Sequence, residues 1–129
     1  LKPLEGVVEL LHYAQDRHIA CAIASSARSA KFIADHIDIS KYMQTIVTGN
    51  DISKSKPDPE IFLLAADRMH VQPGDCIVIE DAGVGIQWAK AAWMKTVGLT
   101  RSGDHSIYVA DLIISSLAEY SHIINYFAL

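Results

Sequence analysis

The sequence predicts a doubly wound α/β domain, in which helices cover both faces of a parallel sheet. Short apolar runs, each of a length that suits a buried strand, alternate along the chain with stretches whose apolar residues recur at helical spacing. The runs at 19–24 and 76–79 are apolar throughout and do not alternate with polar residues, which indicates strands buried on both faces. Alternation of such strands with helices is typical of a parallel sheet.

The first half of the chain is expected to contain two helix and strand pairs. Apolar residues at helical spacing predict a helix near residues 7–14, and the run at 19–24 predicts the first strand. A second helix is expected at about 28–37, followed by a short strand at 45–48. In that second helix we expect Phe32, Ile33 and Ile37 to share one apolar side, and Ser26 to be the capping residue.

The second half repeats the alternation. Asp58 and Pro59 are a capping side chain followed by a proline, a combination that favours the start of a helix. Turn residues separate the elements that follow. In order, we expect a helix at 59–70, strands at 76–79, 95–99 and 112–114, a helix at 84–92, a polar loop at 101–105 and a last helix after the third of these strands.

Length and composition limit the organisation of the chain to one unit. It has 129 residues, of which 50% are hydrophobic, enough for one core, and no internal repeat or second domain is visible. We therefore expect residues 1–129 to form a single domain. Cys21 and Cys76 each lie in an apolar run, where inert core thiols are expected rather than a disulfide or a metal pair.

Charge and hydropathy argue against several classes of partner. The formal net charge is −4 and the basic residues are scattered, so we expect no nucleic-acid partner. No apolar stretch reaches the roughly 20 residues of a membrane-spanning helix, and no secretory signal is visible. We expect no membrane partner and a cytoplasmic location.

Candidate functional residues follow the expected strands, at the sheet edge where ligands bind in doubly wound folds. Ser25 and Ser26 follow the first strand, Lys56 lies in the loop after the second, and Glu80 and Asp81 follow the third. Hydroxyls at the start of a helix suit an anion such as phosphate. A lysine beside two prolines suits phosphate charge or a carboxylate nucleophile. The alternatives are an ordinary helix cap for the serines and a solvated loop lysine for Lys56, as expected for Lys54.

Glu80 and Asp81 are the most informative pair, because two adjacent carboxylates repel each other where a buried strand emerges. They are tolerable if a hard cation such as Mg²⁺ binds one of them and hydrogen-bond donors satisfy the other. Gly83 and Gly85 then allow close approach to the backbone. The alternative is that Asp81 simply caps the following helix.

In order and spacing, these segments resemble three of the four motifs of the haloacid dehalogenase superfamily, across essentially the whole chain. The motifs are the serine after an apolar strand, the box at 56–59 and the segment at 79–86. Segments 57–62 and 85–92 resemble the branch of β-phosphoglucomutases and sugar-phosphate phosphatases most. The resemblance implies a Rossmannoid core domain and Mg²⁺-dependent phosphoryl transfer through an aspartyl-phosphate.

The resemblance also implies a role for each matching residue. Ser25 and Lys56 would hold the transferring phosphoryl group, while Asp81 would bind Mg²⁺ and Glu80 would support the metal site. Contacts to the phosphate of the substrate would come from Ser26, Arg28 and Ser29. The implied partner is a small phosphorylated metabolite, with a sugar phosphate as the leading class.

The sequence departs from the family pattern at two positions and in one segment. Trp93 stands where the branch has glycine, and Ala27 replaces a hydroxyl residue. The first motif, Asp-x-Asp-Gly-Thr on an N-terminal strand, and the cap domain after it are absent. We therefore expect an incomplete core domain, a fragment of a longer protein that is inactive by itself. The exposed sheet edge would favour self-association, and the competing hypothesis is a non-catalytic remnant that serves as a binding or interaction module.

Overall fold

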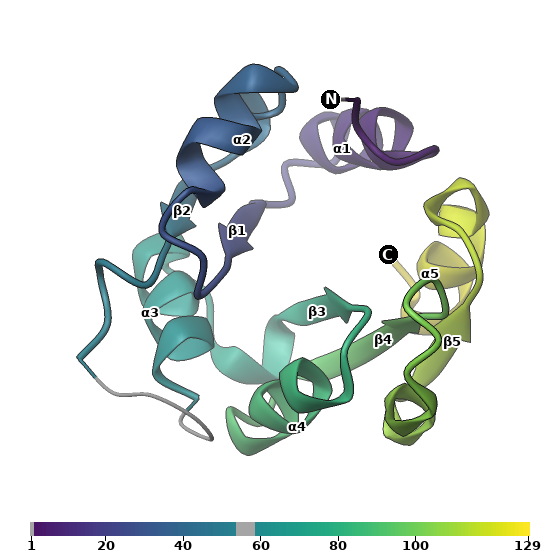
Figure 1. Ribbon diagram of the computed structural model, residues 1–129. Helices are drawn as coiled ribbons and strands as arrows, with labels where there is room; N and C mark the ends of the chain where they lie inside the picture. Colours follow the sequence, from purple (N-terminus) through teal and green to yellow (C-terminus); the bar gives the residue numbers. More distant parts are fainter. Residues whose placement is uncertain (1, 54–58) are drawn as a thin grey trace.

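The computed structural model describes residues 2–53 and 59–129, and it confirms the predicted α/β fold (Figure 1). Helices and strands alternate along the described chain. The strands in these residues are β1 (Ala22–Ala24), β2 (Thr45–Val47), β3 (Ile77–Glu80), β4 (Lys95–Leu99) and β5 (Leu112–Ile114). The α-helices are α1 (Val7–Asp16), α2 (Ala30–His36), α3 (Glu60–Met69), α4 (Gly83–Ala91) and α5 (Tyr120–Phe127).

The strands form two separate parallel sheets. β1 pairs with β2, with Ile23 opposite Ile46, while β3, β4 and β5 form a second sheet in that order. Among the described residues no ladder joins β1 to β3, and Figure 1 shows these two strands on either side of the middle of the molecule. Each sheet therefore ends on an edge strand whose second side is not paired within the described chain.

Helix α1 packs against both sheets and so holds them together on one face. Its Leu11 joins a cluster with Ile23 and Ile46 of the two-stranded sheet. Its Leu10 packs with Val97 of β4 in another cluster, and Val7 contributes to both. One helix therefore buries apolar surface from both sheets, which no strand pairing joins within the described part of the chain. Such burial stabilises the fold by roughly 25 cal/mol per Å² of apolar area.

The opposite face is covered by α3 and α4. Phe62 of α3 and Trp88 of α4 lie in one cluster with Val47 of β2 and Met94, which precedes β4. Ala65 and Ala66 of α3 and Ala89 of α4 let these helices lie close to the strands, because their side chains are only methyl groups. Helices thus cover both faces of the strands, as the apolar character of the strands predicted.

Two details of the first half differ from the sequence prediction. β1 begins at Ala22 rather than residue 19, because the chain turns after α1: His18 is left-handed and the amide of Ile19 donates to the Ala14 carbonyl. In α2 the buried residues are Ala30 and Ala34. The expected packing side was wrong, since Phe32 is 70% and Ile33 40% exposed.

The two cysteines are free thiols, and burial raises the pKa of both. Cys76 is buried and Cys21 half-buried. None of the helices that the structure describes combines the length and the apolar character needed to span a membrane.

Candidate functional site

The loops after β1 and β2 fit closely against each other. Ser25, the first residue after β1, donates its amide hydrogen to the Val47 carbonyl at 2.9 Å, and its Oγ accepts from the Ala27 amide at 3.2 Å. A Cβ on Gly49 would lie 2.4 Å from the carbonyl oxygen of Ser26, so only glycine allows this approach. The Ser25 hydroxyl is thereby fixed beside the end of β2.

Ser26 does not cap a helix, which corrects the sequence prediction. α2 begins at Ala30, Ser29 occupies the N-cap position, and no side chain caps it. The reason is local: the Ala30 amide donates to the Ala27 carbonyl, so residues 26–29 form a turn before the helix. Ser26, Arg28 and Ser29 remain exposed, and they present two hydroxyls and a guanidinium to solvent beside Ser25.

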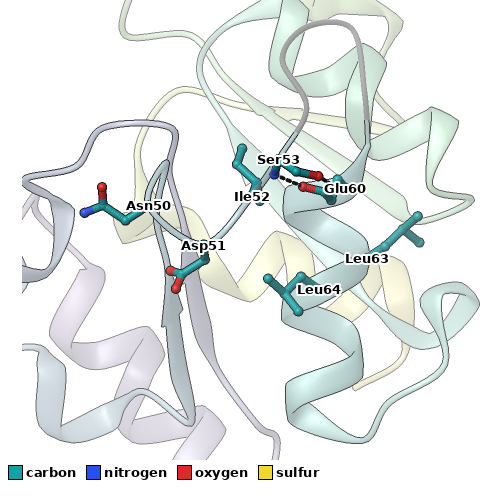
Figure 2. Close-up of a pocket in the computed structure, with 7 residues that line it drawn as sticks. All are labelled: Asn50, Asp51, Ile52, Ser53, Glu60, Leu63 and Leu64. Carbon is teal, nitrogen blue, oxygen red and sulfur yellow. Dashed lines mark hydrogen bonds between the residues drawn. The ribbon is translucent and has the colours of Figure 1, made fainter.

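Lys56 lies outside the described residues, as does Asp58 of the same motif. The residues on either side of this segment are tied to each other. The Ser53 amide donates to Glu60 Oε1 at 2.6 Å and the Ser53 hydroxyl donates to Oε2 at 3.1 Å, as the dashed lines in Figure 2 show. Ser53 follows the β2 loop and Glu60 begins α3, so these hydrogen bonds join the loop after β2 to the start of α3.

A pocket of about 790 Å³ lies beside these residues, but its chemistry does not suit a phosphate (Figure 2). Asp51 and Glu60 line it, and both carboxylates are engaged: Asp51 accepts from the Thr48 amide at 2.9 Å and pairs with Arg68 at 3.6 Å. The Thr48 amide, more than Arg68, lowers the pKa of Asp51. Two carboxylates would repel an anion. The pocket is lined by Asn50, Asp51, Ile52, Ser53, Glu60, Leu63 and Leu64.

Glu80 is the last residue of β3, and its side chain folds back over the turn that follows. Its Oε1 accepts from the amides of Asp81 at 3.1 Å and Ala82 at 3.2 Å. These are the donors that one of the two carboxylates was expected to need. Burial raises the pKa of Glu80, the two N–H donors oppose that shift, and the charge of Asp81 adds to it.

Asp81 presents its carboxylate at the end of the strand, 36% exposed, with Nη1 of Arg101 at 3.6 Å from Oδ2. It does not cap α4: Ala82 occupies the N-cap position and has no side-chain cap. The amide of Gly83 instead donates to Asp104 Oδ2 at 2.8 Å. Asp81 is therefore an accessible carboxylate whose oxygens suit a hard cation. A cation that binds there would have to compete with Arg101 for Asp81 Oδ2.

The candidate residues gather in two groups that the described contacts do not join. Ser25, Ser26, Arg28 and Ser29 lie beside the β2 loop, and the pair Glu80–Asp81 lies beside the loop after β4. In residues 2–53 and 59–129 no hydrogen bond or ion pair links the groups. Within those same ranges no three His, Cys, Asp or Glu side chains gather as a metal site would require. Asp81 and Glu80 could thus supply only part of a cation site.

Sequence reasoning missed the loop after β4, which it treated only as polar. Arg101, Ser102 and Asp104 all contact the turn at residues 81–83. A signal was available, because β3 and β4 are neighbours in a parallel sheet and the loops at their carboxyl ends must meet. Polar residues directly after the strand at 95–99 therefore belong to the same edge as Asp81.

Comparison with known proteins identifies relatives of this chain. The family described as haloacid dehalogenase-like hydrolase matches residues 1–99. β-Phosphoglucomutase of Bacillus subtilis is 36% identical over 116 residues, which are 90% of this chain and 50% of the relative. Fructose-1-phosphate phosphatase of Escherichia coli is 39% identical over 95 residues, 74% of this chain and 50% of the relative.

Solved structures share the same arrangement of helices and strands. A β-phosphoglucomutase from Clostridium difficile superposes with a TM-score of 0.88 at 29% identity, over 97% of this chain and 56% of that protein. A phosphatase of the same superfamily from Thermococcus onnurineus gives a TM-score of 0.85 at 25% identity, over 93% and 57% of the two chains. The chain therefore spans about half the length of these relatives. The order of its elements, the segments that follow β1 and β3 and the match over residues 1–99 together place the chain in the haloacid dehalogenase-like hydrolase family.

Proposed function

We propose that this chain is the phosphate-holding and cation-holding part of a Mg²⁺-dependent phosphatase or phosphomutase. Its substrate is a small phosphorylated metabolite, with a sugar phosphate as the leading class. The observation that carries the proposal is the pair Glu80–Asp81 at the end of β3, where one carboxylate is held by backbone amides and the other is accessible. The relatives named as a phosphoglucomutase and a sugar-phosphate phosphatase support the substrate class.

Each candidate residue then has a definite task. Asp81 would bind Mg²⁺, and Glu80 supports it by holding the turn through the Asp81 and Ala82 amides. When bound, Mg²⁺ supplies charge neutralisation for the phosphoryl oxygens. Ser25 and Lys56 hold the transferring phosphoryl group by a hydroxyl and an ammonium.

The exposed turn after β1 would serve the rest of the substrate. Ser26, Arg28 and Ser29 are all exposed there, and a guanidinium with hydroxyls beside it is suited to a second phosphate or to sugar hydroxyls. The free energy of such contacts contributes to orientation of the substrate. Loss of Arg28 should therefore raise KM more than it lowers kcat.

A further part of the proposal concerns the two sheets. β1 and β3 each have one side that is not paired within the described chain, and both strands are parallel to their neighbours. We place one extended segment of a longer protein between them, carrying the Asp-x-Asp-Gly-Thr motif and so the nucleophile. On this proposal the present 129 residues have no turnover alone.

The test is a phosphatase and mutase assay of the full-length product of the gene with Mg²⁺, preceded by reading its upstream coding sequence. Lys56→Ala should lower kcat by about 100-fold to 1,000-fold, the loss typical of removing one group that stabilises transition-state charge. Lys54→Ala is the matched control and should keep full activity. The enzymatic proposal fails if no Asp-x-Asp is encoded upstream or if Lys56→Ala remains fully active.

The second candidate function is an interaction module without catalysis, and the unpaired sides of β1 and β3 favour it. Edge strands pair readily with another chain. This candidate predicts that the full-length product has no phosphatase or mutase activity with any sugar phosphate tested and still forms a stable complex through the sheet edges. Turnover by the full-length product would exclude it.

A further inference from the structure

The loop after β4 contacts the turn that carries Asp81 at three points. Ser102 Oγ donates to the carbonyl oxygen of Asp81 at 2.5 Å, and Arg101 Nη1 lies 3.6 Å from the Asp81 carboxylate. Asp104 Oδ2 accepts the amide hydrogen of Gly83, the first residue of α4, at 2.8 Å. The direction in which the Asp81 side chain points is therefore set partly by a loop that follows another strand.

Asp104 is the best-anchored of these contacts. Its Oδ1 accepts from the amide of Ser106 at 2.9 Å and from the hydroxyl of Ser106 at 2.5 Å, while Oδ2 holds Gly83. The Gly83 amide, followed by the Ser106 donors, lowers the pKa of Asp104. Both oxygens of Asp104 are thus occupied by donors, so this carboxylate acts as a link between two loops and not as a ligand of its own.

The contact between the loop after β4 and the start of α4 requires glycine at position 83. A Cβ on Gly83 would lie 1.7 Å from Ser106 Oγ and 2.6 Å from Ser106 Cβ, so no other residue fits without moving the loop. Gly83 is also buried. The absence of a side chain at one position and the carboxylate at the other together let the loop lie directly on the first turn of α4.

We propose that Asp104 is a positioning residue for Asp81, which fixes the turn at residues 81–83 so that the Asp81 carboxylate faces a divalent cation. This inference rests on the proposed function, because it concerns the carboxylate that is assigned to Mg²⁺ there. Replacing a residue that orients a metal ligand typically lowers the metal affinity roughly 10-fold to 100-fold. If Asp104 had only a structural role, its replacement would lower the stability of the chain and would leave the cation affinity at Asp81 unchanged.

The test uses Mn²⁺ as the probe and the amide resonances of the 129-residue chain as the readout. Substoichiometric Mn²⁺ should broaden the amides around Asp81 in the unaltered chain. In Asp104→Ala the apparent Mn²⁺ affinity at this position should fall roughly tenfold, and exchange of the Gly83 amide hydrogen should accelerate. Asp104→Asn, which keeps an oxygen for Gly83, should restore most of the affinity.

Asp111→Ala is the matched control. Asp111 Oδ2 also accepts a backbone amide, from Thr96 at 2.8 Å, but it lies before β5, away from the Asp81 turn. This variant should be less stable than the unaltered chain and should bind Mn²⁺ at Asp81 equally well.

The outcomes separate the two proposals. Broadening at Asp81 that is equally strong in Asp104→Ala and in the unaltered chain would overturn the positioning role and leave the proposed function standing. If the unaltered chain shows no broadening around Asp81, this inference fails, whereas the cation assignment is decided separately by the turnover of Asp81→Ala in the full-length product. Should Asp104→Ala lose its dispersed amide spectrum, Gly83→Ala decides in its place, because its added Cβ would displace the Ser106 side chain from the turn. An Mn²⁺ affinity in Gly83→Ala equal to that of the unaltered chain would contradict the inference.

Discussion

The side chain of Glu80 lies directly against the backbone of Gly85, so that a Cβ on Gly85 would come within 2.3 Å of the Glu80 Cδ. Gly85 lies in the first turns of α4, and Glu80 ends the strand before it. The glycine is required because the carboxylate folds back over the helix to reach the Asp81 and Ala82 amides. The strand end and the helix start are thus a single unit.

Gly85→Ala should displace the Glu80 carboxylate and destabilise the chain. Overpacking of this kind costs about 1–3 kcal/mol in free energy of unfolding, measured by urea denaturation. Gly74→Ala is the control, because nothing lies within 4 Å of a Cβ there. An equal loss in the two variants would show that Glu80 does not occupy the space over Gly85.

Ile86 should be among the positions most sensitive to truncation. Its side chain is fully buried, at 0% exposure, on the helix that follows Asp81. Ile86→Ala should lower the free energy of unfolding by about 2–5 kcal/mol and Ile86→Val by about 0.5–1.5 kcal/mol, since the cavity scales with the atoms removed. Thermal unfolding followed by circular dichroism measures both, and similar values for the two variants would contradict tight packing at this site.

Glu119 should make the chain more stable at neutral pH than in acid. Its Oε1 accepts from the Ser115 hydroxyl and amide and from the Ser116 amide, and these donors, Ser115 first, lower its pKa. A lowered pKa in the folded state means that the stabilisation is present above the unfolded pKa and is lost as the pH falls through the folded pKa.

Glu119→Gln should therefore destabilise the chain at about pH 7 and much less at an acidic pH below the folded-state pKa of Glu119, where the carboxyl group is protonated in both states. Urea midpoints at the two pH values measure the difference. Glu5→Gln, at an exposed position with no described hydrogen bond, is the control and should shift neither midpoint. A Glu119→Gln effect of equal size at both pH values would show that the carboxylate charge is not what stabilises this turn.

The unpaired sides of β1 and β3 should make the isolated chain self-associate. The N–H and C=O groups at a sheet edge can form hydrogen bonds with a strand of another chain. Association between copies of the chain would therefore depend on hydrogen bonds rather than on surface charge. Sedimentation velocity should show an average mass that rises with protein concentration and that added salt does not reduce. A monomer at all concentrations would count against an open position between the two strands.

Much of the fold could be predicted from the sequence because the strand signals were strong. The runs at 95–99 and 112–114 have the bounds of β4 and β5, since each ends in apolar residues and is followed by a polar one. The packing of α2 could not be predicted in this way. Phe32 and Ile33 are the larger apolar residues, but the helix buries Ala30 and Ala34 instead, and residue size alone does not indicate which side of a helix faces the core.

The sequence predicted the parts of the candidate site that adjacent residues form. It did not predict the contacts between segments that lie far apart in the sequence. The pair Glu80–Asp81 and its need for donors follow from adjacent residues. The contact between Asp104 and Gly83 joins residues 21 positions apart, and no local pattern reveals it. The helix cap expected at Ser26 failed for a related reason, because the Ser25 hydroxyl accepts the Ala27 amide and the turn delays the helix.

The most direct measurement is the Mg²⁺-dependent turnover of a sugar phosphate by the full-length gene product, compared between the unaltered protein and Asp81→Ala. We expect turnover that requires Mg²⁺ in the unaltered protein and a loss of at least about 100-fold in Asp81→Ala, since charge neutralisation by the cation is worth several kcal/mol. Asp75→Ala, at the opposite end of β3, should keep full turnover. Undiminished turnover in Asp81→Ala would contradict the assignment of this strand end to the cation.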